Sequence, residues 1–270
     1  MAAVTAGSMR GIPYLAVGDG PPLVLMQGLT PTHDLPTGFQ RRMVLSTATP
    51  LSGDFRVYVV NRKQGLHPGE SMSDIAGYLA AAIEDEFGGP VLLTGTSTGG
   101  SVALQLAVDR PELVRALVVV ASAYRLGPRG RRLQQELAQL TRDGDFAGGW
   151  AEMMARMLPS PLQRPARPLA RAMMGPMAPE DPTDLLVTLD AEDAFDVRDQ
   201  LRRITAPTLV IGGANDVFYG RELFERTAAG VRDGRAHIYP DWGHMRTCTS
   251  STTTNLTVGF FLAAVPQLIG

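Results

Sequence analysis

A serine, an aspartate and a histidine occur along this chain at positions that suit acyl-transfer chemistry. Ser97 is the centre of the stretch GTSTG, with Gly95 two residues before it and Gly99 two residues after it. A serine hydroxyl becomes an effective nucleophile when a base takes its proton and a third group orients that base. Asp216 and His244 follow Ser97 along the chain, and they are the side chains that could supply those two roles.

The residues around Ser97 predict a sharp turn between a strand and a helix. An apolar run at 91–94 precedes the serine, and an amphipathic helical pattern follows at 98–114. At such a turn the serine backbone is strained, and the close approach of strand and helix leaves room only for small neighbours. The helix N-terminus would also favour a developing oxyanion. A structural turn with a serine near the helix start is the alternative interpretation.

Asp216 and His244 both come directly after apolar runs, at 206–216 and 234–244. If these runs are parallel strands, both residues lie at the carboxyl edge of the sheet, where open α/β sheets build their sites. The run at 115–122 ends without a carboxylate, so that strand end offers no competing acid. A turn aspartate after a strand remains the alternative for Asp216.

Four histidines are present, and three of them are poorly placed to act as the base. His237 lies inside a predicted strand, and His33 and His67 lie in loops before the nucleophile. His244 is therefore the predicted base. The amide of Thr98 and the amide of Leu29, which follows the first central strand, are the predicted oxyanion donors.

The elements that would position these residues alternate between strands and helices. Such alternation predicts an α/β fold in which a mostly parallel central sheet is flanked by helices. The predicted strands are 22–28, 55–62, 90–95, 115–122, 206–216 and 234–244, and the predicted helices are 71–88, 98–114 and 252–265. Residues 124–203 lack strand patterns and predict a helical cap, so the core divides into 1–123 and 204–270.

The composition excludes several classes of function. Twenty-five Lys and Arg balance 27 Asp and Glu, for a net charge of −2, and neither HExxH nor CxxC spacing occurs. We expect no nucleic-acid or membrane partner, no metal and no cofactor. The single cysteine, Cys248, and the lack of a signal-peptide pattern favour a cytoplasmic location. A small-molecule substrate is expected, and a homodimer is left open.

Several segments together resemble the α/β-hydrolase superfamily, in particular its small capped serine hydrolases with esterase and lactonase members. These segments are LVLMQG, GTSTGGSVALQLAVDRPELVRALVVV, ITAPTLVIGGAND and YPDWGH. The resemblance implies a cofactor-free catalytic triad in the order Ser97, Asp216, His244. Two positions depart from the usual pattern: Gln27-Gly28 replaces a common His-Gly, and the segment from Asn61 lacks the usual Asp-x-Arg-Gly. A serine at 97 is unlike the aspartate of epoxide hydrolases and haloalkane dehalogenases.

Methionines are concentrated in the predicted cap. Near Trp150 they form two clusters, comprising Met153, Met154, Met157, Met173, Met174 and Met177. Methionine adapts to irregular apolar pockets, so we predict that Met153, Met154, Met157 and Met174 bind a lipophilic part of the substrate. The alternative is that these side chains pack the cap onto the core.

The sequence thus predicts a serine hydrolase that cleaves a carboxylic ester, lactone or thioester of a small, lipophilic substrate through an acyl-enzyme on Ser97. Two alternatives remain open. The same triad could cleave an amide or a C–C bond, because it fixes the roles of the residues but not the leaving group. The fold could also serve a small-molecule receptor or a non-hydrolytic protein with slow turnover.

Overall fold

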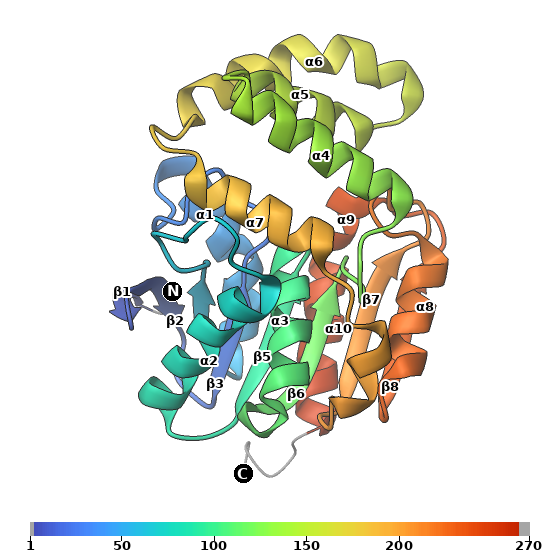
Figure 1. The fold of residues 1–270 in the computed structure, drawn as a ribbon. Helices are drawn as coiled ribbons and strands as arrows, with labels where there is room; N and C mark the ends of the chain where they lie inside the picture. Colours follow the sequence, from blue (N-terminus) through green and yellow to red (C-terminus); the bar gives the residue numbers. More distant parts are fainter. Residues whose placement is uncertain (1–2, 265–270) are drawn as a thin grey trace.

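An eight-stranded sheet forms the centre of the molecule (Figure 1). The computed structural model describes residues 3–264. Strand order is β1-β2-β4-β3-β5-β6-β7-β8; β1, β2 and β4 pair antiparallel, and every neighbouring pair from β4 to β8 is parallel. The strands are β1 (Val4–Met9), β2 (Ile12–Val17), β3 (Pro22–Met26), β4 (Arg56–Val60), β5 (Val91–Thr96), β6 (Val114–Val120), β7 (Thr208–Gly213) and β8 (Gly234–Tyr239). This confirms the predicted α/β fold with a mostly parallel sheet.

Helices cover both faces of the sheet and its carboxyl edge (Figure 1). The α-helices are α1 (Gly38–Ala48), α2 (Met72–Phe87), α3 (Thr98–Asp109), α4 (Pro128–Arg142), α5 (Phe146–Arg156), α6 (Ser160–Met174), α7 (Thr183–Ala194), α8 (Arg221–Gly230), α9 (His244–Thr249) and α10 (Ser251–Ala264). Short 3₁₀ helices are η1 (Thr49–Gly53), η2 (Pro111–Leu113), η3 (Gly175–Met177) and η4 (Arg198–Arg203). In Figure 1, α2, α3 and α8 lie in front of the sheet and α10 lies behind it.

The sheet separates two apolar clusters. The cluster on the α2 and α3 face contains fully buried side chains such as Leu79 and Val102. The cluster on the α10 face contains Phe55 and Phe261, whose rings meet edge to face at 6.0 Å. Because both faces are covered, the central strands are apolar on both sides, which is why they read as continuous apolar runs.

Four helices, α4 to α7, are inserted between β6 and β7 and lie over the carboxyl edge of the sheet (Figure 1). Their buried side chains, such as Leu137 and Leu185, belong to the same apolar cluster as α2 and α3. The insertion is therefore packed onto the core. It falls within the predicted cap, 124–203. The predicted core ranges 1–123 and 204–270 include residues 1–2 and 265–270, which lie outside the described residues.

Some elements were not predicted from the sequence. These are the β1–β2 hairpin and helices α1, α8 and α9. The predicted helix at 98–114 is also too long, because α3 ends at Asp109 and Pro111 begins a short 3₁₀ helix. Proline has no backbone N–H to continue an α-helix. Within residues 3–264, no helix has both the length and the apolar character needed to cross a membrane.

Candidate active site

Ser97 lies at the turn between β5 and α3 with a strained backbone. Its φ of 54° and ψ of −126° belong to a region that non-glycine residues rarely adopt. A Cβ on Gly95 would lie 2.2 Å from the carbonyl oxygen of Gly99, and a Cβ on Gly99 would lie 2.3 Å from that of Gln27. Only glycine fits at either position. The turn thus has the tight geometry predicted for GTSTG, and strain of this kind persists where the surroundings enforce it.

The structure brings Ser97, Asp216 and His244 together although they are far apart in the sequence. His244 Nε2 lies 3.0 Å from Ser97 Oγ, and His244 Nδ1 lies 2.7 Å from Asp216 Oδ2. Asp216 can only accept at Nδ1, so the Nδ1–H tautomer donates to the carboxylate. Nε2 is then free to accept the Ser97 hydroxyl proton. The arrangement is that of a nucleophile, a base and an orienting acid.

The surroundings of His244 shield it from water and fix its orientation. The second carboxylate oxygen of Asp216 accepts a hydrogen bond of 2.9 Å from the amide of Phe218, whose ring packs 4.7 Å from the imidazole. Burial lowers the pKa of His244, but the Cys248 sulfur and the Asp216 carboxylate outweigh this effect and raise the pKa well above its usual value. The protonated imidazole, which forms when Ser97 loses its proton, is thus stabilised by Asp216.

The two predicted oxyanion donors lie on segments that touch each other. Thr98 is the first residue of α3 and is fully buried. Leu29 follows Gly28 in the loop after β3, and a Cβ at Gly28 would lie 3.4 Å from Ser97 Cβ. The loop after β3 therefore packs directly against the serine turn. The amides of Leu29 and Thr98 need this proximity if both are to donate to one oxyanion.

The other three histidines lie elsewhere. His67 and His237 are exposed. His33 is buried, donates from Nδ1 to the Lys63 carbonyl over 2.8 Å and accepts at Nε2 from Arg62 Nε over 3.1 Å. Burial, followed by the nearby Arg62 charge, lowers the pKa of His33 to about 3. His33 is therefore neutral in the folded protein.

Arg62 supports the loop that carries Leu29, and sequence reasoning missed this role. Its buried guanidinium donates to the carbonyl of Gly28 over 3.1 Å and to Thr30 Oγ1 over 3.0 Å. Asn61 adds a bond of 2.9 Å from its Nδ2 to the same hydroxyl. These residues belong to the segment that departs from the usual family pattern. The unusual sequence of the segment from Asn61 was a signal that it makes contacts that differ from those of the usual family pattern.

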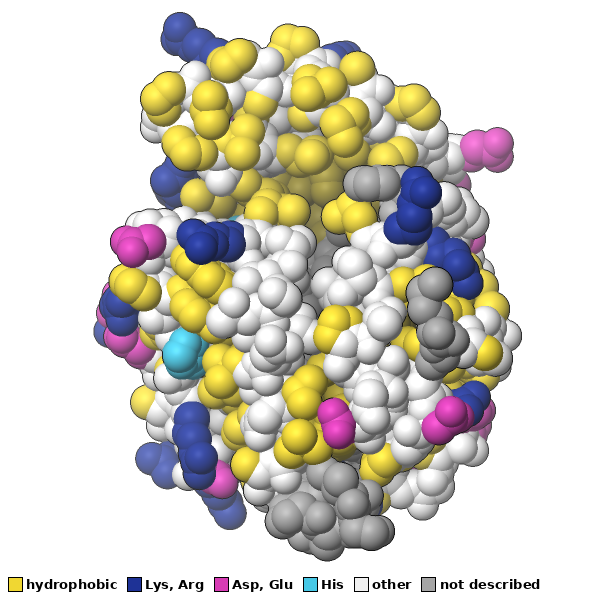
Figure 2. Space-filling view, turned by 180° about the vertical axis from the view of Figure 1, so that it is seen from behind, with side chains coloured by type: hydrophobic (Ala, Val, Ile, Leu, Met, Phe, Trp, Pro, Cys, Tyr) yellow, Lys and Arg dark blue, Asp and Glu magenta, His cyan; other side chains and the backbone are white. Residues whose placement is uncertain are grey.

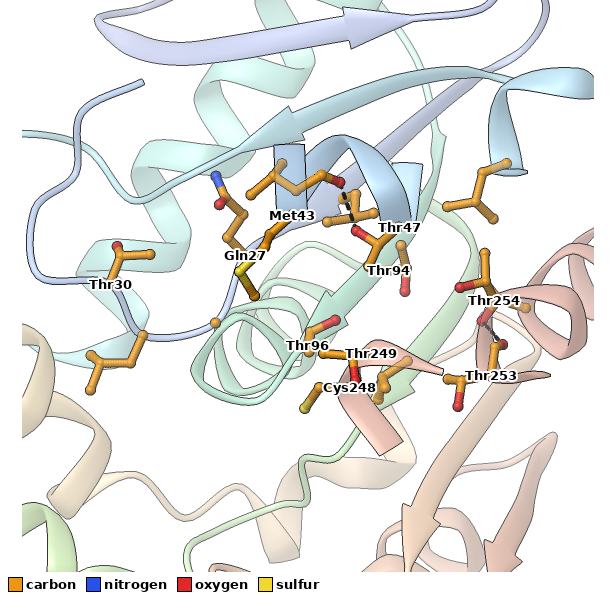
Figure 3. Close-up of a pocket in the computed structure, with 17 residues that line it drawn as sticks. Gln27, Thr30, Met43, Thr47, Thr94, Thr96, Cys248, Thr249, Thr253 and Thr254 are labelled. Atoms are coloured by element: carbon orange, nitrogen blue, oxygen red, sulfur yellow. Dashed lines mark hydrogen bonds between the residues drawn. The ribbon is translucent and has the colours of Figure 1, made fainter. Parts of the chain in front are cut away.

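A cavity of about 200 Å³ adjoins the serine turn (Figure 3). It lies between β3, β5, α1, α9 and α10, and Leu29, Thr96 and Cys248 line it next to the candidate triad. Threonines make up much of the lining, namely Thr30, Thr47, Thr94, Thr96, Thr249, Thr253, Thr254 and Thr257. In Figure 3, Thr96 and Cys248 lie in the lower middle of the lining, between Thr30 on one side and Thr253 on the other.

Several of these threonine hydroxyls are already bonded to backbone carbonyls. Thr47 donates to Val44, Thr249 to Met245 and Thr257 to Thr253 over 2.8, 2.8 and 3.0 Å. A hydroxyl that is satisfied in this way has little capacity left for a ligand. The cavity therefore presents a largely apolar surface despite its polar residue types.

The four methionines predicted to bind substrate do not line the cavity beside the serine turn, nor do they line three further cavities of the described residues. Met153 and Met174 are buried in the core cluster, and Met154 and Met157 are half-buried against it. These four side chains therefore pack against the apolar core cluster. That they also contact a substrate stays a prediction. Figure 2 shows apolar side chains gathered on the insertion above a hollow between insertion and core.

Metal-binding side chains do not gather within residues 3–264: no cluster of three or more His, Cys, Asp or Glu could hold an ion there. The polar atoms of the candidate site are those of Ser97, His244 and Asp216, together with the two expected backbone amides.

Comparison with known proteins agrees with this geometry. Residues 23–248 match the Alpha/beta hydrolase family. The chain is 28% identical over 254 residues to the pimeloyl-[acyl-carrier protein] methyl ester esterase of Nitrosomonas europaea, covering 87% of this chain and 93% of that protein. It is 31% identical over 178 residues to the "Putative carbamate hydrolase RutD" of Variovorax paradoxus, covering 64% of this chain and 66% of the relative.

Solved structures show the same fold. The enol-lactonase of Burkholderia xenovorans LB400 superposes with a TM-score of 0.67 at 18% identity, over 97% of this chain and all of that chain. At this identity the likeness concerns the fold alone. The family match covers most of the sequence and includes the serine turn, Asp216 and His244. This chain belongs to the alpha/beta hydrolase family.

Proposed function

We propose that this hydrolase cleaves a carboxylic ester, lactone or thioester of a small, apolar substrate through an acyl-enzyme on Ser97. The observation that carries the proposal is the continuous hydrogen-bonded chain from Ser97 through His244 to Asp216 at a strained strand-to-helix turn. The names of the two curated relatives, a methyl ester esterase and a carbamate hydrolase, add support for acyl chemistry.

In the proposed mechanism, Ser97 Oγ attacks the substrate carbonyl carbon while His244 Nε2 takes its proton. The Leu29 and Thr98 amides stabilise the resulting oxyanion, and Asp216 stabilises the imidazolium. Collapse of the intermediate breaks the bond to the leaving group, which takes the proton from His244. A water molecule then attacks the acyl-enzyme with His244 again as base, and the acid product leaves Ser97.

The cavity next to the serine turn, which Leu29 and Thr96 line, supports a small substrate. Its 200 Å³ is below the range of about 300–1,000 Å³ common for ligand pockets. Its lining offers mostly methyl groups, because the hydroxyls of Thr47, Thr249 and Thr257 are bonded to the backbone. A short, unbranched aliphatic group attached to the scissile carbonyl suits this space.

The test is a panel of p-nitrophenyl esters from C2 to C12, extended by methyl esters and a carbamate, with wild type, Ser97→Ala and His244→Ala. We expect both variants to lose about 10³-fold or more in kcat. His237→Ala, which alters an exposed histidine on β8, is the matched control and should behave as wild type. Short-chain esters should be preferred. Full turnover by Ser97→Ala would overturn the proposal, and very slow wild-type turnover would favour a receptor.

A further inference from the structure

A buried carboxylate from the insertion reaches the residue that follows the candidate nucleophile. Glu192, near the end of α7, is 0% exposed. One of its oxygens accepts a hydrogen bond of 2.7 Å from Thr98 Oγ1, and the other accepts one of 2.8 Å from Ser101 Oγ. Both donors lie in the first turn of α3. The insertion is thereby bonded to the helix start at which one oxyanion amide is expected.

Glu192 also binds two further segments. Gln134 on α4 donates to it over 2.9 Å, and the Tyr219 hydroxyl donates over 3.4 Å from the loop that contains Asp216. Burying a carboxylate is costly unless donors surround it, and here four donors do. Contacts to α3, α4 and the Asp216 loop thus converge on a single side chain. Such a costly group suits a role in holding these segments in a fixed arrangement.

Arg62 is a buried residue of opposite charge that is bonded to the loop after β3. Burial lowers the pKa of Arg62 to about 10, while the charges of Glu192 and Asp184 oppose that shift. Arg62 holds the loop of the second expected amide through its bond to the Gly28 carbonyl. The two segments that would form the oxyanion hole are therefore each bonded to a buried charged side chain, the Gly28 loop to Arg62 and the start of α3 to Glu192.

We propose that Glu192 is a positioning residue for the oxyanion hole, which fixes the Thr98 amide by anchoring the Thr98 side chain. The inference rests on the proposed function, because an oxyanion hole is needed only for acyl transfer. Donors stabilise an oxyanion best when they are held in place before the reaction, so a loosened Thr98 should weaken the transition state more than substrate binding. In this proposal, helix α7 of the insertion helps to form the oxyanion hole, because Glu192 lies on it.

The test compares Glu192→Gln, Thr98→Val and Thr98→Ser. Glutamine keeps the size of Glu192 but leaves one acceptor oxygen for two hydroxyls, and valine removes the anchored hydroxyl while leaving the Thr98 amide. We expect kcat to fall about 10- to 1,000-fold in both, with KM changing less than about threefold. Thr98→Ser keeps the hydroxyl and should stay within a few-fold of wild type.

Two further readouts separate positioning from general stability. A trifluoromethyl ketone forms an oxyanion on Ser97, so its affinity should fall in parallel with kcat. The double variant Glu192→Gln/Thr98→Val should be no worse than either single variant, because both remove the same anchor. Asp190→Asn changes an exposed carboxylate on the same helix and should leave kcat unchanged.

Defined outcomes would overturn the inference. Folded Glu192→Gln and Thr98→Val with wild-type kcat and inhibitor affinity would do so. A loss confined to KM or to the melting temperature would assign Glu192 a structural role alone. If Glu192→Gln does not fold, the comparison of Thr98→Val with Thr98→Ser tests the inference. Failure of the proposed function is distinct, since it would appear as undiminished turnover in Ser97→Ala.

Discussion

Helices α6 and α7 belong to the same insertion, yet they are attached to the molecule in different ways. On α7, Leu185 and Leu189 are 1% exposed, and Glu192 makes buried hydrogen bonds to the core. On α6, Leu162 is 53% exposed and Leu169 is 66% exposed. The insertion is thus not a uniform cap. Its last helix is built into the candidate site, whereas α6 presents much of its apolar surface to solvent.

The polar contacts of the two helices differ in the same way. Asp184 at the start of α7 accepts hydrogen bonds of 3.1 and 2.7 Å from the amides of Gly65 and Leu66, in the loop after β4. Arg171 on α6 instead pairs with Asp145 at the start of α5, where both side chains are exposed. The two backbone amides fix the Asp184 carboxylate on the loop after β4. The exposed ion pair of Arg171 and Asp145 is screened by water and contributes little.

The largest expected effect contrasts a buried and an exposed arginine. Arg62→Met removes the charge that faces Glu192 and Asp184 and leaves buried acceptors without donors, so we expect unfolding free energy to fall by about 3–5 kcal/mol. Arg171→Met removes an exposed partner of Asp145 and should change stability little. Urea unfolding of both variants measures the difference. Similar losses in the two would mean that the exposed ion pair of α6 stabilises the protein as much as the buried contacts of Arg62.

A second contrast uses leucines of the two helices. Leu189→Ala opens a cavity beneath α7 and should cost about 2–5 kcal/mol in unfolding free energy. Leu169→Ala truncates a side chain that is mostly in solvent and should change it by no more than about 0.5 kcal/mol. Thermal and urea unfolding would check both values. A large cost at Leu169 would contradict the exposed arrangement of α6.

The same contrast explains what could be predicted from the sequence. The turn at Ser97 and the strand ends before Asp216 and His244 were predictable, because each depends on local patterns: an apolar strand, a glycine turn and a following helix. The β1–β2 hairpin was missed. Its turn is Arg10-Gly11, with φ of 48° and 80°, and an arginine at positive φ is not the usual signal for a two-residue hairpin.

The hydrogen bonds of Glu192 lie beyond local patterns, since their donors are far from it in the sequence and reach it only after α7 packs on the core. One signal was present: Leu185, Thr188, Leu189 and Glu192 share one face of α7, and a glutamate on an apolar face predicts a buried partner. The methionines illustrate the reverse case. Their residue type suggested a pocket, but burial of Met153 and Met174 depends on how α5 and α6 fold together.

The smallest expected effect is a pH dependence at the contact between α7 and the loop after β3. His33 Nδ1 lies 3.7 Å from Asp184 of α7, and Arg62 holds its other ring nitrogen. Its pKa is about 3 in the folded protein and near 6.5 when unfolded. Between these two pH values His33 binds a proton in the unfolded chain but not in the folded protein. The free energy of unfolding therefore falls as the pH drops below about 6.5, and His33 has little effect on it at higher pH.

Lowering the pH from 6.5 to 5 should therefore remove about 1.6 kcal/mol of unfolding free energy through His33. His33→Gln cannot titrate and keeps an acceptor for Arg62, so its stability should change less over the same interval. Urea unfolding of both proteins at pH 7.5, 6.5 and 5.0 measures the difference. Equal pH slopes would show that His33 is not held neutral. His33 would then not be the neutral, buried neighbour of Asp184 that distinguishes the start of α7 from the solvent-exposed ion pairs of α6.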